Sequence, residues 1–451
     1  MGSQKQEARK KRYLCESQVF ILASGFLLLA SKFYWRLATA MQIDGLGERL
    51  SRVSALRPRV PLPGLGPRPG ASSNSERLAQ LLGGENRVNR FGCHFFLRTR
   101  FSQPAAGLPG HPKMGPRSLR LLAPTYGNSA ADLDRWLFLD TETTGLAGGT
   151  GTYPFLVGLA FWEQGSFVVE QLFMRDYSEE PSLLFELLEP LSKQCMLFTF
   201  NGKSFDWPLL ETRYQIARVG SLPPPKAHVD MLHPARQLWR SRLKSVALSE
   251  LERHILQLER GNDIPSETIP RRYFEFIRGG SPEPMADIFR HNQMDLCGLA
   301  SLALHVIRML EDPENSGCAA DELFGISRML QRRGDDLFAG RIYKQALERG
   351  LTGEAEHIAQ RELARLARRQ HDYELSNALW EKLLLSPAEG ARAYEQLAIY
   401  YEHYAHQPEK AAALSREALI RLQDEYSSGR IDVFKYVRWH ARFQHRLNRL
   451  I

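Results

Sequence analysis

The chain has 451 residues, of which 43% are hydrophobic and 24% charged, and its formal net charge is +8. This length is too great for one typical hydrophobic core, so we expect at least two domains in an ordinary soluble globular protein. The positive charge favours a polyanionic partner such as nucleic acid, although a solvated helix face explains many C-terminal arginines equally well.

The pattern of cysteines bears on metal binding, on disulfides and on the cellular compartment. They are odd in number, scattered along the chain, and no two form a C-x-x-C pair, which argues against a zinc site and against a disulfide framework. They are typical of a reducing compartment, so we expect a cytoplasmic location. The five are Cys15, Cys93, Cys195, Cys297 and Cys318.

Residues 1–40 form a separate N-terminal segment. A basic stretch at 10–12 precedes an uncharged, mostly apolar run at 17–31, and an A-T-A sequence follows. This order imitates a signal peptide, but the run, lengthened by Phe33–Trp35, is also typical of a membrane anchor. A third interpretation is an optional leader before a true start at Met41. A signal peptide is the least attractive of the three interpretations, because a secreted protein without disulfides is unusual.

Residues 41–130 are expected to form an N-terminal segment and linker. A short helix is predicted at 76–82, with Ser75 available as its N-cap, and a strand at 89–101. Two stretches rich in proline and glycine predict loops, namely Leu56–Ser75 and Gln103–Pro116.

Residues 131–312 combine strand and helix signals in one central domain. Apolar, β-rich runs predict strands at 136–141, 153–162, 166–174, 196–201 and 228–232, with a hairpin between the second and third. Amphipathic patterns predict helices at 181–191, 205–218, 249–258 and 284–310. This order predicts an α/β mixed sheet flanked by helices, of ribonuclease-H-like order.

Residues 320–451 are expected to form an all-α domain, because strand signals vanish there. The repeat period lies in the mid-thirties, which suits tetratricopeptide-like hairpins, although a plain helical bundle is also consistent with the pattern. A basic amphipathic helix at 433–451 could cap the stack. Three helix pairs are predicted, at 322–333 with 337–348, 354–368 with 374–385, and 391–403 with 409–421.

The first predicted strand of the central domain runs directly into two carboxylates, in the sequence L-F-L-D-T-E-T-T-G. These are Asp140 and Glu142, and alternate side chains of a strand share one face, so both point to the same side. Burying two like charges together is costly unless a cation lies between them. Hard oxygen ligands suit magnesium or manganese.

Two later positions can complete such a site. Asp206 opens a predicted helix, where a carboxylate also serves as an ordinary N-terminal cap. His291 and Asp295 are four residues apart and share one helical face, as an ordinary surface pair would. Together with the strand acids they make a four-acid set able to hold two divalent cations, Mg²⁺ or Mn²⁺, roughly 3.5–4 Å apart for phosphodiester hydrolysis. A histidine can serve as general base there.

Three motifs resemble those of the DnaQ-like, or DEDD, exonuclease superfamily: D-T-E-T-T-G, N-x-x-x-F-D and the final aspartate motif. The continuation L-A-G-G-T-G-T-Y-P-F-L-V-G and the ending H-N-x-x-D are similar to its YprB-type branch. The resemblance covers residues 137–308, with a fainter echo at 89–101. It implies a metal-dependent 3′→5′ exonuclease with Asp140, Glu142, Asp206 and Asp295 as ligands. His291 would take the place of the general base, although it stands at the spacing of the superfamily's tyrosine type.

The sequence evidence for residues that contact a substrate is weaker than the evidence for the metal ligands. Thr143 and Asn201 could touch the terminal nucleotide by similarity to the superfamily, but local turn bonding explains them equally well. Arg240 and Lys244 lie in a basic cluster beside Trp239, which could grip a single strand or form a solvated helix face. A second group, His228, Asp230 and His233, is better explained as a polar pair at a strand end than as a metal site.

The sequence leaves the function open between two classes. The first is a two-metal nuclease acting on single-stranded ends of DNA or RNA. The alternative is a nucleic-acid-binding ribonuclease-H-like scaffold whose helical repeats recruit a protein partner. A membrane-attached version is a third interpretation and rests wholly on residues 17–35.

Overall fold

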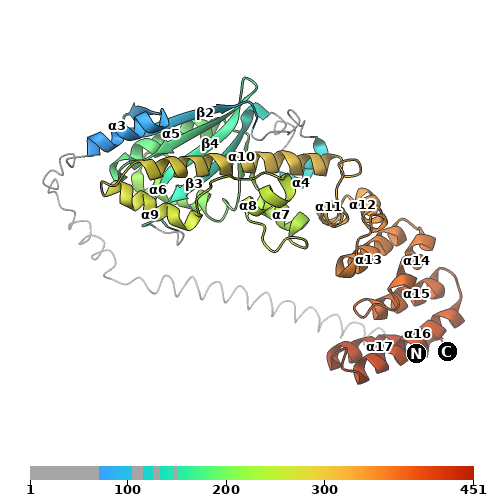
Figure 1. Ribbon diagram of the computed structural model, residues 1–451. Helices are drawn as coiled ribbons and strands as arrows, with labels where there is room; N and C mark the ends of the chain where they lie inside the picture. Colours follow the sequence, from blue (N-terminus) through green and yellow to red (C-terminus); the bar gives the residue numbers. More distant parts are fainter. Residues whose placement is uncertain (1–70, 104–114, 125–132, 146–149, 451) are drawn as a thin grey trace, which may run out of the picture. The chain divides into compact units, whose positions relative to one another are not determined.

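The computed structural model describes residues 71–103, 115–124, 133–145 and 150–450, so the predictions for residues 1–70 lie outside it. Its central part is one seven-stranded sheet in the order β1-β2-β5-β4-β3-β6-β7 (Figure 1). The strands are β1 (Glu85–Asn89), β2 (Gly92–Phe101), β3 (Trp136–Thr143), β4 (Pro154–Glu163), β5 (Ser166–Phe173), β6 (Met196–Thr199) and β7 (His228–Asp230).

The strand directions confirm the predicted mixed sheet. β3, β4 and β5 pair antiparallel in sequence order, and the last two are joined by the expected hairpin. β6 then pairs parallel with β3, and β7 parallel with β6. Helices connect the parallel strands, as such crossovers require. The carboxyl ends of β3, β6 and β7 therefore meet at one edge of the sheet.

The sheet begins earlier in the chain than residue 131. β1 and β2 form a hairpin in place of the single strand predicted at 89–101, and β2 pairs antiparallel with β5. Phe95 and Phe96 of β2 are buried in the same core as the central strands. The hairpin is therefore part of the same sheet, not of a linker.

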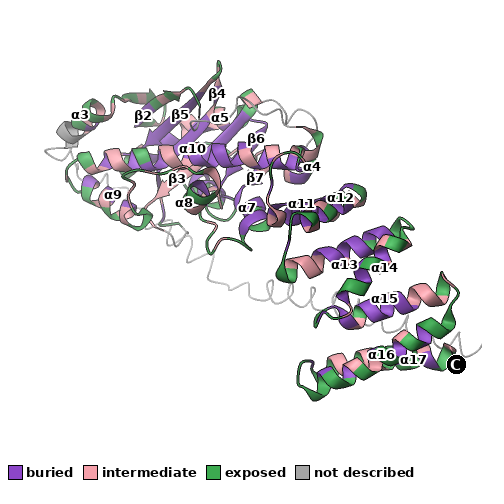
Figure 2. Cartoon of the chain, turned by 45° about the vertical axis from the view of Figure 1, so that its right-hand side comes forward, coloured by how far each residue is buried: buried purple, intermediate pink, exposed green. Residues whose placement is uncertain are grey.

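Both faces of the sheet are covered. Because successive side chains of a strand alternate, Trp136 and Phe138 belong to one buried cluster and Leu137 and Leu139 to the other. Helix α10 (Glu283–Glu311) lies along β3, β4 and β5 (Figures 1 and 2). It is long and apolar enough to span a membrane, but 67% of its most apolar window is buried within the protein, as in a core helix.

The other helices of this region differ from the predictions at several points. α3 starts at Ala71, so Ser75 lies inside it and is not its N-cap. The helix predicted at 249–258 is a short α-helix followed by a π-helical turn. α4, α7 and α9 were not predicted, since each is short and contains or adjoins proline. The helices are α3 (Ala71–Leu82), α4 (Pro116–Leu122), α5 (Glu180–Lys193), α6 (Asp206–Ala217), α7 (Leu232–Trp239), α8 (Leu248–Leu251) and α9 (Ile269–Ile277).

Residues 320–450 are helical, as predicted, and each helix contacts the next in sequence. Asp335 and Asp372 stand at equivalent N-caps, where each carboxylate accepts a backbone N–H of the following helix. Tyr343 and Trp380 are buried at equivalent places in those helices. The helices are α11 (Ala320–Arg332), α12 (Asp336–Glu348), α13 (Gly353–Arg369), α14 (Tyr373–Leu383), α15 (Gly390–His403), α16 (Pro408–Ser427) and α17 (Val433–Leu450).

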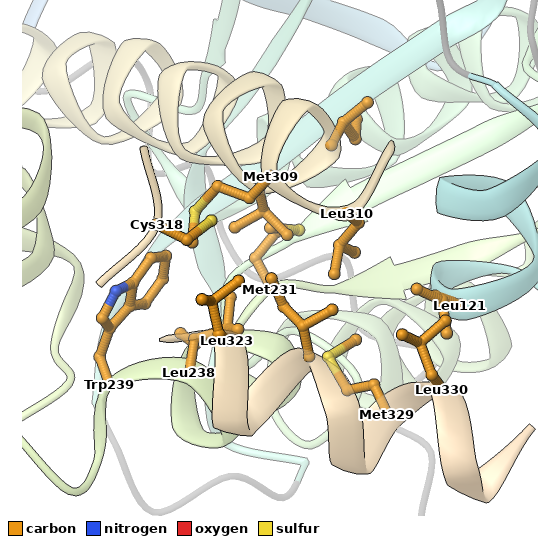
Figure 3. Packing of buried hydrophobic residues seen from close by; sticks show 14 of the residues in the cluster. Leu121, Met231, Leu238, Trp239, Met309, Leu310, Cys318, Leu323, Met329 and Leu330 are labelled. Carbon is orange, nitrogen blue, oxygen red and sulfur yellow. The ribbon is translucent and has the colours of Figure 1, made fainter. Parts of the chain in front are cut away.

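The first C-terminal helix packs directly against the sheet region. Figure 3 shows Leu323 of α11 beside Leu238 and Trp239 of α7. The Trp239 indole Nε1–H donates to Glu322 Oε1 at 2.7 Å. A Cβ at Gly325 would come within 2.5 Å of the Gln237 carbonyl oxygen, so a larger residue would separate the two helices. The core thus continues from the sheet region into α11.

Candidate active site

The two strand acids lie where β3 leaves the core. β3 is buried from Trp136 to Leu139 and half-buried from Asp140 onward. In the antiparallel register, Asp140 stands opposite Gly158 of β4, and Glu142 stands opposite Leu156. Both acids lie on the sheet face that α10 covers, because residues of α10 contact each of them.

A buried amide chain holds the Asp140 carboxylate. The Asn292 Nδ2–H of α10 donates to Asp140 Oδ2 at 2.8 Å, and Asn292 Oδ1 in turn accepts from Gln171 Nε2 at 2.9 Å. Asn292 and Gln171 are fully buried. Gly158 leaves space for this contact, since a Cβ there would lie 2.2 Å from Asn292 Oδ1. Asn292 stands in the H-N-x-x-D motif, yet sequence reasoning assigned it no role.

Asp206 reaches the same sheet edge from the start of α6. The Thr141 hydroxyl of β3 donates to its carboxylate Oδ1, which ties α6 to the strand that carries Asp140 and Glu142. Asp206 is the first residue of the helix, where the positive end of the helix dipole favours a carboxylate. The capping role and the site role therefore coincide at this residue.

The loop before α6 is organised by Asp230, at the end of β7. Its carboxylate accepts the backbone N–H of Asn201 at 2.7 Å and that of Lys203 at 3.1 Å. Asn201 has a left-handed φ of 64°, and a Cβ at Gly202 would lie 2.5 Å from the Thr199 side chain. These contacts give Asp230 a structural role. It supports the loop that leads to Asp206, in agreement with its interpretation as a polar residue at a strand end.

His291 lies between acids from three segments. Its Nδ1 is 2.6 Å from Asp263 Oδ1, while its Nε2 is 3.4 Å from Asp295 Oδ2 and 4.0 Å from Glu142 Oε1. Burial acts to raise the pKa of Asp263, but hydrogen bonds from His291 and Arg260 lower it overall. Asp263 thus contacts one ring nitrogen of His291, and the other, Nε2, faces the acids with the Ser266 hydroxyl 3.4 Å away.

Arg260 is the cation that contacts this group. Its guanidinium lies 2.5 Å from Asp295 Oδ1 and 3.1 Å from Asp263 Oδ2, and it also pairs with the buried Glu252. It thus links the last acid of the set to the residue that orients His291. Neither Arg260 nor Asp263 was predicted, because they lie in an irregular segment whose position the sequence pattern does not define.

Burial and nearby negative charges raise the pKa of three of these acids. Burial, and then the negative charges of Asp295, Glu142 and Asp206, raise the pKa of Asp140 well above its ordinary value. Burial and the charges of Asp295 and Asp206 raise the pKa of Glu142 to about 8. Burial also raises the pKa of Asp206 to about 6, against the opposing hydrogen bond from Thr141. Such mutual repulsion favours a bound cation.

The donor set fits a divalent cation. Glu142, His291 and Asp295 each offer one ligand atom within 4.8 Å of the others. Asp140 and Asp206 add carboxylate oxygens at the same sheet edge, which are the ligands that magnesium and manganese prefer. Asp140, Glu142, Asp206 and Asp295 are called the acid cluster below.

Thr143, Arg240 and Lys244 were predicted as substrate contacts. The Thr143 hydroxyl donates to the Gly145 carbonyl oxygen at 2.9 Å, which is a local turn bond. Arg240 and Lys244 are exposed after α7, near the contact with α11. Within the described ranges, no hydrogen bond or ion pair joins either of them to the acid cluster.

The fold and the site define a class of protein. A seven-stranded mixed sheet carries acids on its first central strand and on the helix that crosses it, and a model for the RNase_H superfamily matches residues 137–307. The chain therefore contains an RNase H-like domain, which is a nuclease-type fold.

The chain also matches an individual protein. "Uncharacterized protein YprB" of Bacillus subtilis (strain 168) is 30% identical over 302 residues, which are 66% of this chain and 72% of the relative. The chain belongs to the YprB family, as its motifs predicted. Among solved structures, the family B DNA polymerase of Pyrobaculum calidifontis is similar over 44% of this chain and 29% of the polymerase chain, at 13% identity. The TM-score of this match is 0.30.

Proposed function

We propose that the protein is a two-metal-ion nuclease, acting as a 3′→5′ exonuclease on DNA or RNA. The observation that supports this proposal most directly is the acid cluster, in which burial and the neighbouring negative charges raise the pKa of Asp140 and Glu142. A module that only binds nucleic acid has no need to bury four acids together, because like charges destabilise the fold unless a cation neutralises them. The direction of cleavage rests on the resemblance to the DEDD superfamily.

In this proposal the acid cluster would hold the cations, Mg²⁺ or Mn²⁺. When bound, they supply water activation and neutralise charge at the phosphodiester. The chain's own part is to position the ligands. Asn292 orients Asp140, Thr141 orients Asp206, and Arg260 restrains Asp295. Outer contacts of this kind fix ligand direction and affect metal affinity.

His291 is proposed as the general base. Asp263 fixes its ring through Nδ1, so Nε2, beside the Ser266 hydroxyl, would accept a proton from water close to Glu142 and Asp295. The ring is only 5% exposed, so its position is defined by packing against the sheet. The arrangement is that of a base held by a carboxylate, with the reacting nitrogen directed at the acids.

The test compares two aspartates. Asp140→Asn keeps the shape of the side chain and removes its charge. Asp287→Asn makes the same change near the start of α10, where Asp287 pairs with Arg272 and Arg290 outside the cluster. End-labelled single-stranded DNA and RNA are incubated with each full-length variant and with magnesium or manganese.

The expected result is metal-dependent shortening from the 3′ end by the wild type and by Asp287→Asn, with a loss of about 100-fold or more in Asp140→Asn. Equal cleavage by both variants would mean that another protein or another site is responsible. Binding of nucleic acid with no cleavage by the wild type would support the scaffold, with the C-terminal helix pairs as tetratricopeptide-like repeats for a protein partner.

A further inference from the structure

The C-terminal helices carry a second charged site, far from the acid cluster in sequence and opposite in sign. A hollow of about 320 Å³ opens between α13, α14, α15 and α17. We call it the arginine groove. It is lined by Arg365, Trp380, Arg392, Glu395, Gln396, Arg438, Trp439 and Arg442. A neighbouring hollow shares Arg392, Arg438 and Trp439 with it and adds Ala388, Phe434, Lys435 and one acid, Asp432.

The groove is positively charged. Glu395 is the single acid in its lining, and it pairs with Arg442 at 2.6 Å. Arg365 and Arg392 have carboxylates of Glu362 and Glu389 nearby, at 3.4 and 3.2 Å. Arg438 has no ion pair among the residues that the structure describes. The positive charge therefore exceeds what the lining itself neutralises.

The groove lining also contains a buried hydrogen-bond donor without an acceptor. The Trp380 side chain lines the hollow and is 1% exposed, and its indole Nε1–H has no acceptor within the described part of the chain. An indole nitrogen can only donate. Burying it without an acceptor is unfavourable.

Helix α17 alternates basic and aromatic side chains on this side. Phe434 and Lys435 are followed four residues later by Arg438 and Trp439, so the two pairs lie on neighbouring turns. Phe434 is 84% exposed, and the Arg442 guanidinium lies 5.0 Å from the centre of the Trp439 ring. The sequence of α17 contains no acidic residue.

We infer that the arginine groove binds single-stranded nucleic acid. Each nucleotide joins a phosphate to a planar base. The groove offers guanidinium groups for phosphate oxygens and the half-buried Trp439 ring, and the exposed Phe434 ring in the neighbouring hollow can stack on bases. An acidic peptide would satisfy the arginines but has no regular planar group for Phe434 and Trp439. The inference rests on the proposed nuclease function, since it assigns the groove to the strand that the acid cluster cleaves.

The test is a double charge reversal in the full-length protein. Arg392→Glu/Arg438→Glu changes the groove, and Lys344→Glu/Arg416→Glu makes the same change of charge at exposed positions of α12 and α16 outside it. Binding of a single-stranded oligonucleotide of about 30 nucleotides is measured by fluorescence anisotropy across a salt series. Cleavage of a dinucleotide is measured in parallel. Circular dichroism and thermal melting verify folding, and the milder variant Phe434→Ala probes stacking alone.

We expect the groove variant to bind the oligonucleotide about tenfold or more weakly than the control, with a salt slope smaller by about 2. Its cleavage of the dinucleotide stays at the level of the control. Affinity equal to the control overturns the inference, even if cleavage by the wild type supports the nuclease. Groove-dependent binding by a protein that cleaves nothing supports the groove and contradicts the nuclease. Equal competition by polyglutamate would overturn nucleic acid in favour of an acidic peptide.

Discussion

The sheet region and the C-terminal helices each gather like charges, but they do so in different ways. The acid cluster is half-buried, and Asn292, Thr141 and Arg260 hold its carboxylates in place. The arginine groove lies at a surface, and several of its guanidinium groups have long, partly exposed side chains. Fixed acids suit a reaction that needs defined ligand positions, whereas adjustable arginines suit a partner recognised by charge.

The acid cluster and the arginine groove also differ in the energetic effect of gathering like charges. Burial and mutual repulsion raise the pKa of Asp140 well above its ordinary value, so the site gains from a cation. The arginines remain charged in the groove, where water and nearby carboxylates limit repulsion. Changes at residues that only support the acid cluster should therefore have large effects, while single changes in the groove should have small ones.

The largest expected effect that sharpens this comparison comes from His291. His291→Gln should lower turnover about 100-fold or more, because it removes the proposed base while keeping a polar side chain. Asp263→Asn should lower it less and should shift the pH–rate profile, because it changes how the ring is held. Rates are measured with a short single-stranded substrate at saturating metal. A fall in rate without any change in the pH profile in either variant would contradict the assignment.

Next in size is the amide chain behind Asp140. Asn292→Ala should reduce activity about 10–100-fold, because it removes the donor that orients a metal ligand. Gly158→Ala should do the same from the opposite strand, since its Cβ would displace Asn292. Metal affinity measured by calorimetry should weaken in both. Gly151→Ala is a suitable control, because no atom lies near its added Cβ.

A smaller effect is expected where the two regions meet. Trp239→Phe removes the indole donor to the buried Glu322 and should lower the free energy of unfolding by about 1–3 kcal/mol. Trp439→Phe, in the arginine groove, should change it less. Urea unfolding followed by circular dichroism measures both. If Trp239→Phe lowers the free energy of unfolding no more than Trp439→Phe does, the hydrogen bond between α7 and α11 contributes little to stability.

A further expected effect is on stability as a function of pH. Since burial raises the pKa of Glu142 to about 8 and that of Asp206 to about 6, the folded chain retains protons that the unfolded chain releases above about pH 5. In the presence of a chelator this contribution is complete at low pH and is lost as the pH rises through about 8. The melting temperature should fall by a few degrees over that range. Magnesium or manganese should reverse the fall, and Glu142→Gln should abolish most of it.

Local patterns were sufficient for much of the fold. Alternation along β3 placed Asp140 and Glu142 on one face, and the four-residue spacing placed His291 beside Asp295. The N-caps Asp335 and Asp372 repeat with the helix pairs. These features depend on neighbours within one element, so periodicity is enough to predict them.

Other features depend on contacts between distant segments. Asp263 and Arg260 lie in an irregular stretch, and only packing against α10 brings them to His291 and Asp295. Short helices such as α7 bury their apolar residues against the domain, because they are too short to be stable alone. No local sequence pattern predicts such residues.

The sequence by itself determined the mixed α/β class, the helical C-terminal region and the acids expected to lie together. Strand alternation and helix periodicity carry that information directly. The tertiary structure decided which side chains support those acids, how Gly158 makes room for Asn292, and that α13, α14, α15 and α17 enclose a hollow of arginines and tryptophans. The physical reason is that burial and electrostatic repulsion arise between segments far apart in the chain, and these exist only once the chain has folded.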